Sequence, residues 1–280
     1  MKRMLTTIFL FLMISSAHAQ PFDLKSVGEA KTFRLRVYFG TQGKGAFVQY
    51  QGQKGIIPLQ VKSRTVDSTE RKSGQPDFTT YVWNEVINGK VTGSYGLTLG
   101  LREILDIWYL RKKDGKRFSL ESTDQKSDSY DGEDQYLLHG ALLAFNHTKH
   151  DRFHIEYPDG TKKAMQLPDF DQPNHARQSI IADYNFDGYD DVAFSIPDAG
   201  MGVYRIFSIW LYQPKSGRFE KLPDPDYSRS NCSELCDVRI DSKKKLLFTS
   251  CRGGASWWQD VYRFSSPNKL VWVKSSKANH

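Results

Sequence analysis

The residues best suited to chemistry are oxygen-bearing side chains spaced along residues 183–191, which read D-Y-N-F-D-G-Y-D-D. Oxygen ligands at alternate positions can wrap one hard cation when a glycine permits a sharp turn, as Gly188 would here. A flexible cage of carboxylates and carbonyls suits Ca²⁺ better than Mg²⁺. The spacing therefore predicts a calcium site. The predicted ligands are four side-chain oxygens and one backbone carbonyl, from Asp183, Asn185, Asp187, Asp191 and, through its carbonyl, Tyr189.

This loop is not an EF-hand, because its twelfth position is Phe194 instead of the bidentate Glu of that motif. Short apolar runs flank it at residues 179–182 and 192–196, and such runs are typical of buried strands. A strand–loop–strand setting resembles the calcium loops of β-propeller blades of the FG-GAP and integrin type. The alternative is an acidic turn that binds nothing tightly. A bound ion would brace the fold, since no nearby acid or base indicates a catalytic metal.

Two further groups of residues could carry chemistry. His147, His150 and His154 could bind zinc if they shared a helix face, but their surroundings read as a loop passing into a strand, which predicts separate, exposed histidines. Trp83 and Glu85 share a predicted strand face, a pattern found in sugar sites and in ordinary β cores alike. The sequence contains no nucleophile elbow, HExxH pair or P-loop. We therefore expect a protein that is not an enzyme.

Residues 251–263, which read C-R-G-G-A-S-W-W-Q-D-V-Y-R, form the main candidate for a partner-binding surface. Two glycines let a backbone protrude. Adjacent tryptophans in a strand point to opposite faces, so at least one is expected to be exposed or half-buried. Exposed Trp, Tyr and Arg are typical of binding hot spots. The competing interpretation is a hairpin connection whose tryptophans close the core.

Three cysteines lie close together near the end of the chain. A predicted hairpin that pairs Asp241 with Leu246 places Cys236 opposite Cys251. We therefore expect a Cys236–Cys251 disulfide, with Cys232 as the free thiol. A Cys232–Cys251 bridge is the alternative.

Residues 1–19 are typical of a secretory signal, with a basic start, an apolar run too short to span a membrane and an A-x-A cleavage site at 17–19. We expect an exported, soluble, periplasmic protein that begins at Gln20. Removing this segment also removes Lys2 and Arg3, which lowers the formal net charge from +7 to +5. That charge suits an acidic partner or an anionic cell wall, and no basic–aromatic stripe indicates nucleic acid.

From residue 32 onward the pattern predicts an all-β protein, because short alternating runs recur between turn residues without a sustained helical period. The clearest hairpin is residues 80–97, where Asn88-Gly89 supplies the two positive φ values of a type I′ turn. Residues 20–31 read as a loose start, and the acidic residues 122–135 read as a linker. The expected units are a signal peptide at 1–19, an antiparallel β unit at 20–125 and a unit with the calcium loop at 136–280. Both a β-propeller-like arrangement and two packed antiparallel β units fit this pattern.

An ordered set of features between residues 180 and 272 resembles a family of secreted bacterial proteins. In chain order they are the D-x-N-x-D-G-Y-x-D loop, the aromatic strand 209–212, the turn 215–219, a polar hairpin, the sequence Gly253-Gly254-Ala255 and the pair Tyr262-Arg263. Members of that family are periplasmic, β-propeller-like and calcium-binding. The characterised ones are immunity proteins that inhibit lysozyme-like peptidoglycan hydrolases delivered by rival cells, and they are structurally similar to periplasmic inhibitors of invertebrate-type lysozymes.

The resemblance implies a calcium-braced inhibitor that sterically occludes the active-site cleft of a lysozyme-type peptidoglycan hydrolase. Lysozyme inhibitors push a loop of small residues into that cleft, and Ser256 and Tyr262 would donate hydrogen bonds to the hydrolase carboxylates. The alternative is a calcium-dependent carbohydrate-binding or surface-adhesion module without inhibitory activity. The expected contact residues are Gly253, Gly254, Ala255, Ser256, Trp257, Tyr262 and Arg263.

Overall fold

The structure is a computed structural model that describes residues 21–68, 77–100, 104–123, 131–149, 151–169, 176–199 and 202–278. These residues form an all-β protein with twenty strands and one short 3-10 turn. The expected signal segment, Gln20 and His150 lie outside the described residues. Within the described ranges there is no helix with the length and hydropathy of a membrane span.

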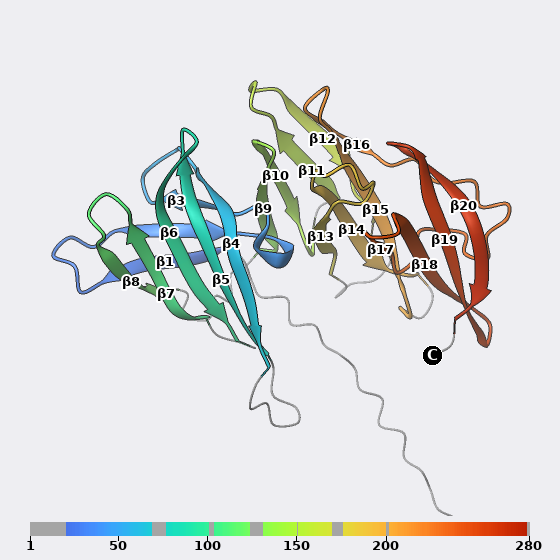
Figure 1. The fold of residues 1–280 in the computed structure, drawn as a ribbon, viewed down its shortest axis with the longest axis horizontal. Helices are drawn as coiled ribbons and strands as arrows, with labels where there is room; N and C mark the ends of the chain where they lie inside the picture. The colour runs from blue at the N-terminus through green and yellow to red at the C-terminus, as the bar shows by residue number, and fades with distance from the viewer. Residues whose placement is uncertain are drawn as a thin grey trace, which may run out of the picture.

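The first eight strands close into an antiparallel barrel, which lies at one end of the molecule (Figure 1). Its core is rich in aromatic residues, and Trp83 and Phe39 are fully buried there. All eight strands contribute inward-facing side chains, but β4 is exposed beyond Leu59. The strands are β1 (Phe22–Val27), β2 (Arg34–Tyr38), β3 (Phe47–Tyr50), β4 (Ile57–Asp67), β5 (Phe78–Ile87), β6 (Lys90–Leu99), β7 (Ile104–Arg111) and β8 (Arg117–Ser122).

The expectation of a loose start at residues 20–31 is wrong, because residues 22–27 form strand β1. It pairs with β2 on one side and with β8 on the other, and so it closes the barrel. Phe22, Leu24 and Ser26 point inward in strict alternation and are buried. The pattern contains only two inward apolar residues before the polar Ser26, and the β8 partner lies about 100 residues further along the chain. The pairing of β1 with these two strands cannot be inferred from local periodicity.

Three four-stranded antiparallel sheets follow the barrel, each in a simple meander (Figure 1). The first contains β9 (Glu133–Leu138), β10 (Ala141–Asn146), β11 (Arg152–Glu156) and β12 (Lys162–Gln166). The second contains β13 (Gln178–Ala182), β14 (Asp191–Pro197), β15 (Arg205–Gln213) and β16 (Arg218–Lys221). The third contains β17 (Arg239–Asp241), β18 (Leu246–Gly253), β19 (Ser256–Ser266) and β20 (Lys269–Lys277).

The middle sheet is buried on both faces, which explains the continuous apolar run of β14. Val192 and Phe194 pack toward the first sheet, whereas Ala193 packs toward the third. In β15, Trp210 faces the first sheet and Ile209 faces the third. The sheets therefore stack face to face in chain order around two shared cores. The molecule consists of packed antiparallel β units, which was one of the two expected architectures.

The connection between β2 and β3 joins the barrel to the sheets. It contains the 3-10 turn η1 (Thr41–Gly43). The Thr41 hydroxyl donates to the Ser179 carbonyl at 3.2 Å, and the Leu137 amide donates to the Gly45 carbonyl at 2.9 Å. The barrel strands end at Ser122 and the first sheet begins at Glu133. The division into units at 20–125 and 136–280 stays a prediction.

Two local predictions from the sequence are confirmed. Asn88 and Gly89 have φ values of 49° and 72°, as a type I′ turn between β5 and β6 requires. Asp241 pairs with Leu246 at the β17–β18 turn.

Candidate functional site

The predicted calcium loop connects β13 to β14, as the flanking apolar runs indicated. Asp183 organises its first half, because its Oδ1 accepts the Asp187 amide at 3.0 Å and its Oδ2 accepts the Gly188 amide at 2.9 Å. Gly188 has a φ of +93°, a conformation that few side chains tolerate. The Asp187 carboxylate in turn accepts the Tyr189 amide at 2.9 Å. These bonds curl the backbone around its own carboxylates.

Asp191 closes the loop from inside the protein. It is fully buried, and its two oxygens accept the amides of Tyr184 and Tyr212, each at 2.8 Å. Burial raises the pKa of Asp191 to about 8, the two amide bonds oppose that rise, and the nearby charges of Asp187 and Asp183 add to it. The loop therefore gathers negative charge at a site where a carboxylate is poorly solvated.

A hard cation fits the chemistry of this loop. Every candidate donor is an oxygen, and a carboxylate oxygen that accepts one amide keeps a second lone pair for a metal. The Asn185 side chain is held in place by its amide nitrogen, which donates to the Pro267 carbonyl at 3.2 Å and to the Asp187 carboxylate at 3.0 Å. No three His, Cys, Asp or Glu side chains of the described residues form a metal site by themselves. A site would thus need the Asn185 and Tyr189 oxygens as well as the carboxylates.

The loop is also tied to the barrel. Lys44, in the β2–β3 connection, forms an ion pair with Asp190 at 2.5 Å. The His139 ring nitrogen Nε2 lies 2.7 Å from the Asp190 carbonyl, and the ring stacks on Tyr212 with centroids 3.9 Å apart. Sequence reasoning passed over Asp190 because it is not in a ligand position. In the structure, Asp190 connects the loop to the barrel through Lys44.

The second candidate is the tip of the β18–β19 hairpin. Gly253 pairs with Ser256, and the two-residue turn Gly254-Ala255 lies between them. Arg252 and the three small residues after it are exposed, whereas Ser256 and Trp257 are half-buried. A side chain at Gly254 would meet nothing within 4 Å. We call residues 252–256 the hairpin tip.

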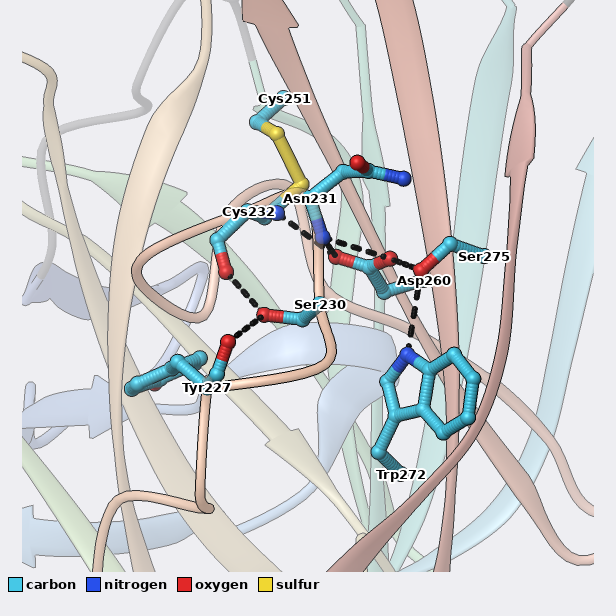
Figure 2. Close-up of a disulfide and its surroundings, with 8 residues drawn as sticks. All are labelled: Tyr227, Ser230, Asn231, Cys232, Cys251, Asp260, Trp272 and Ser275. Atoms are coloured by element: carbon cyan, nitrogen blue, oxygen red, sulfur yellow. Dashed lines mark hydrogen bonds between the residues drawn. A yellow bond between two sulfur atoms is a disulfide. The ribbon is translucent and has the colours of Figure 1, made fainter.

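Both strands of the hairpin are anchored just behind the tip to one segment, residues 230–232 (Figure 2). On β18, Cys251 forms a disulfide with Cys232, with Cα atoms 5.7 Å apart. On β19, the buried carboxylate of Asp260 accepts the amides of Cys232 at 2.8 Å and Asn231 at 3.1 Å. It also accepts the Ser275 hydroxyl. The exposed turn therefore lies at the end of a hairpin whose two strands are held by these contacts.

The disulfide differs from the preferred expectation, since Cys236 is the free thiol and Cys251 bonds to Cys232. The predicted hairpin register holds as far as Arg239 and then fails. Asp237 has a φ of +41°, which turns the chain, and the Cys236 carbonyl accepts the Ser250 amide at 2.8 Å. Cys236 thus lies opposite residue 250, and a shift of one residue removes the expected alignment. The alternative bridge that the sequence left open is the observed one.

Two predicted contact residues do not join the tip. Tyr262 is fully buried in the core between the second and third sheets, so it cannot donate a hydrogen bond to a partner. Arg263 is exposed but pairs with Val271, seven residues along β19 from Ser256. At about 3.3 Å per residue this separation exceeds 20 Å. Tyr262 and Arg263 are therefore removed from the candidate contact surface, which keeps the tip and the half-buried Trp257.

The tryptophans behave as the sequence indicated, and both are half-buried. Trp258 packs on the cysteine cluster and lies under the Lys277 ammonium, 5.6 Å from the ring centroid. Trp257 lies opposite Arg252 at the tip. One tryptophan thus supports the base while its neighbour borders the projecting turn.

The remaining candidates take structural places. Trp83 and Glu85 are both buried inside the barrel, and the Trp83 indole donates to the Gly43 carbonyl at 2.7 Å, so this pair does not form an open sugar site. His147 is half-buried, with ring nitrogens near the Arg177 carbonyl and the Asp134 carboxylate. His154 is exposed.

No family model matches this chain, and no curated protein matches it significantly.

Proposed function

We propose that this protein is a periplasmic, calcium-braced inhibitor of a lysozyme-type peptidoglycan hydrolase. The hairpin tip would enter the hydrolase cleft and exclude substrate sterically. The observation that carries the proposal is the hairpin tip, whose small exposed residues Gly253, Gly254 and Ala255 lie at the end of strands held by a disulfide and a buried carboxylate. A rigid projection loses little conformational freedom when it binds, which favours tight association.

The chemistry of the tip suits a cleft that contains carboxylates. Glycosidases place two carboxyl groups about 5–10 Å apart on either side of the scissile bond. The tip offers the Arg252 guanidinium, the exposed amides of the Gly254-Ala255 turn and the Ser256 hydroxyl as hydrogen-bond donors. Small residues at the turn let these donors approach such carboxylates closely. Trp257 would cover the cleft rim as a hot-spot residue.

Calcium would act as a brace in this proposal. Asp183, Asn185, Asp187 and Asp191 would bind it through side chains and Tyr189 through its carbonyl. The ion would offset the mutual repulsion of the loop carboxylates. Through Asp190 and Lys44, the ordered loop would also hold the sheets against the barrel.

The test is inhibition of peptidoglycan hydrolysis by a panel of purified lysozymes and amidases in calcium buffer. Ala255→Trp adds bulk to the turn without a positive φ, and we expect it to weaken inhibition by about tenfold or more. Ser242→Trp is the matched control, because Ser242 is an exposed turn residue at the opposite end of β18. It should inhibit like the unmodified protein.

Absence of inhibition across both enzyme classes would exclude the proposal. Equal weakening by both substitutions would remove the tip from the mechanism. Binding to purified peptidoglycan without any hydrolase, combined with no inhibition, would instead favour the calcium-dependent adhesion module.

A further inference from the structure

A second candidate site lies on the barrel, at the end of the molecule away from the β17–β20 sheet (Figure 1). A hollow of about 780 Å³ opens between the end of β1, the β1–β2 connection and the turn after β3. A smaller hollow of about 420 Å³ shares Arg34, Tyr50, Gln51 and Gln53 with it. Volumes of this size are typical of small-ligand sites. We call the combined space the rim hollow.

The rim hollow carries an excess of positive charge. Its lining has four cations and two carboxylates: Lys25, Lys31, Arg34 and Arg36, with Glu121 and Asp23. Asp23 is paired with Arg36 at 2.8 Å. Glu121 is already paired with Lys25 at 2.7 Å. The salt bridges found among the described residues include neither Lys31 nor Arg34, and both side chains are exposed. Two cations therefore face the hollow without a carboxylate partner among the residues that the structure describes.

Aromatic rings form the floor beside these cations. Phe33 and Tyr50 are half-buried, with ring centroids 5.9 Å apart. The Tyr50 hydroxyl lies 2.8 Å from the Tyr95 hydroxyl, which donates its only proton to Glu85 at 3.0 Å. Tyr50 must therefore donate to Tyr95.

The Tyr50 ring is thus held by a chain of hydrogen bonds that ends on a buried carboxylate inside the barrel. Burial raises the pKa of both Tyr95 and Tyr50 above the ordinary value of 10.0, so both hydroxyls keep their protons at neutral pH. The ring is a fixed platform at the hollow, and the exposed amide side chains of Gln51 and Gln53 lie at its edge.

We propose that the rim hollow binds a carboxylated saccharide. A fixed aromatic ring can support the apolar face of a sugar, and amide side chains can bond its hydroxyls. The Arg34 guanidinium and the Lys31 ammonium, which form no ion pair with another described residue, would bind its carboxylate, and Arg34 could do so through two parallel bonds. This inference does not depend on the inhibitory role of the hairpin tip.

The experiment is calorimetric titration of the full mature chain with a galacturonate trimer at low ionic strength. Its fully methyl-esterified form is the matched uncharged ligand. The acid should bind at least about tenfold more tightly than the ester. Arg34→Ala and Lys31→Ala should each weaken acid binding several-fold. Arg64→Ala removes an exposed cation from β4, outside the hollow, and should leave binding unchanged.

Each other result contradicts the proposal. Equal binding of acid and ester would exclude charge recognition. Equal weakening by Arg34→Ala and Arg64→Ala would indicate general attraction to a basic protein. Tighter binding of a phosphorylated sugar of the same size would reassign the ligand, and no binding of the trimer at millimolar concentration would remove the site. Failure of hydrolase inhibition would leave all of these outcomes unaffected.

Discussion

At the scale of single residues, the burial of Cys236 has the clearest chemical consequence. Its thiol is free and packs against the Cys232–Cys251 disulfide. Burial raises the pKa of Cys236 to about 12, and the charges of Glu234 and Asp237 add to that rise. The thiolate is the species that attacks a disulfide. The Cys236 thiol therefore stays protonated at neutral pH and does not attack the neighbouring Cys232–Cys251 disulfide.

We predict that Cys236 in the folded protein resists alkylation by iodoacetamide at pH 8, whereas the denatured, unreduced chain takes up one equivalent. Mass spectrometry measures both. Because the folded-state pKa lies above the ordinary value of 9.0, the thiol's contribution to stability is complete below pH 9 and is lost as the pH rises toward 12. Labelling of the folded protein at the denatured rate would contradict this account.

At the scale of elements, the β2–β3 connection shows why close packing decides which substitutions are tolerated. A side chain at Gly40 would overlap Ile181 and would lie 3.0 Å from the Tyr136 ring, both in the sheets. A side chain at Gly55, by contrast, would meet nothing within 4 Å. Neither glycine has a positive φ.

We predict that Gly40→Ala lowers the free energy of unfolding by about 1–3 kcal/mol, because it overpacks the junction between barrel and sheets. Gly55→Ala should be neutral or stabilising by about 0.5 kcal/mol, since it only restricts the unfolded chain. Urea denaturation measures the difference. Equal effects of the two substitutions would mean that the junction does not contribute to stability.

The same scale shows what local pattern could and could not predict. The β5–β6 hairpin was predictable because Asn88-Gly89 encodes its own turn geometry. The β17–β18 register was correct near its turn but failed at Asp237, where a left-handed residue shifts the chain. Strand β1 was missed because its own apolar pattern is short and one of its two partners, β8, is distant in the sequence. The calcium-loop setting was predictable, whereas the burial of Tyr262 needed the tertiary structure.

At the scale of the whole molecule, the calcium loop lies where the barrel meets the sheets, through the Lys44–Asp190 ion pair. Ion binding at this loop should therefore stabilise the entire chain. We predict that calcium at about 100 times its dissociation constant stabilises the fold by about 2.7 kcal/mol, which raises the melting temperature by about 5–10 °C. Scanning calorimetry with and without chelator measures this shift.

Asp187→Asn should abolish the calcium shift, because it removes a ligand charge and keeps an oxygen for the Tyr189 amide. Asp114→Asn is the matched control, since Asp114 accepts the Lys116 amide in a similar turn of the β7–β8 hairpin. It should leave the calcium shift intact. A melting temperature independent of calcium would show that the loop is an acidic turn only.

Competition with a cleft ligand tests most directly whether the hairpin tip occupies a hydrolase cleft. The affinity of this protein for an inhibited lysozyme is measured at rising concentrations of a chitin oligosaccharide that fills the cleft. We predict that the apparent dissociation constant rises in proportion to the oligosaccharide concentration. A dissociation constant that does not change with a saturated cleft would contradict the claim.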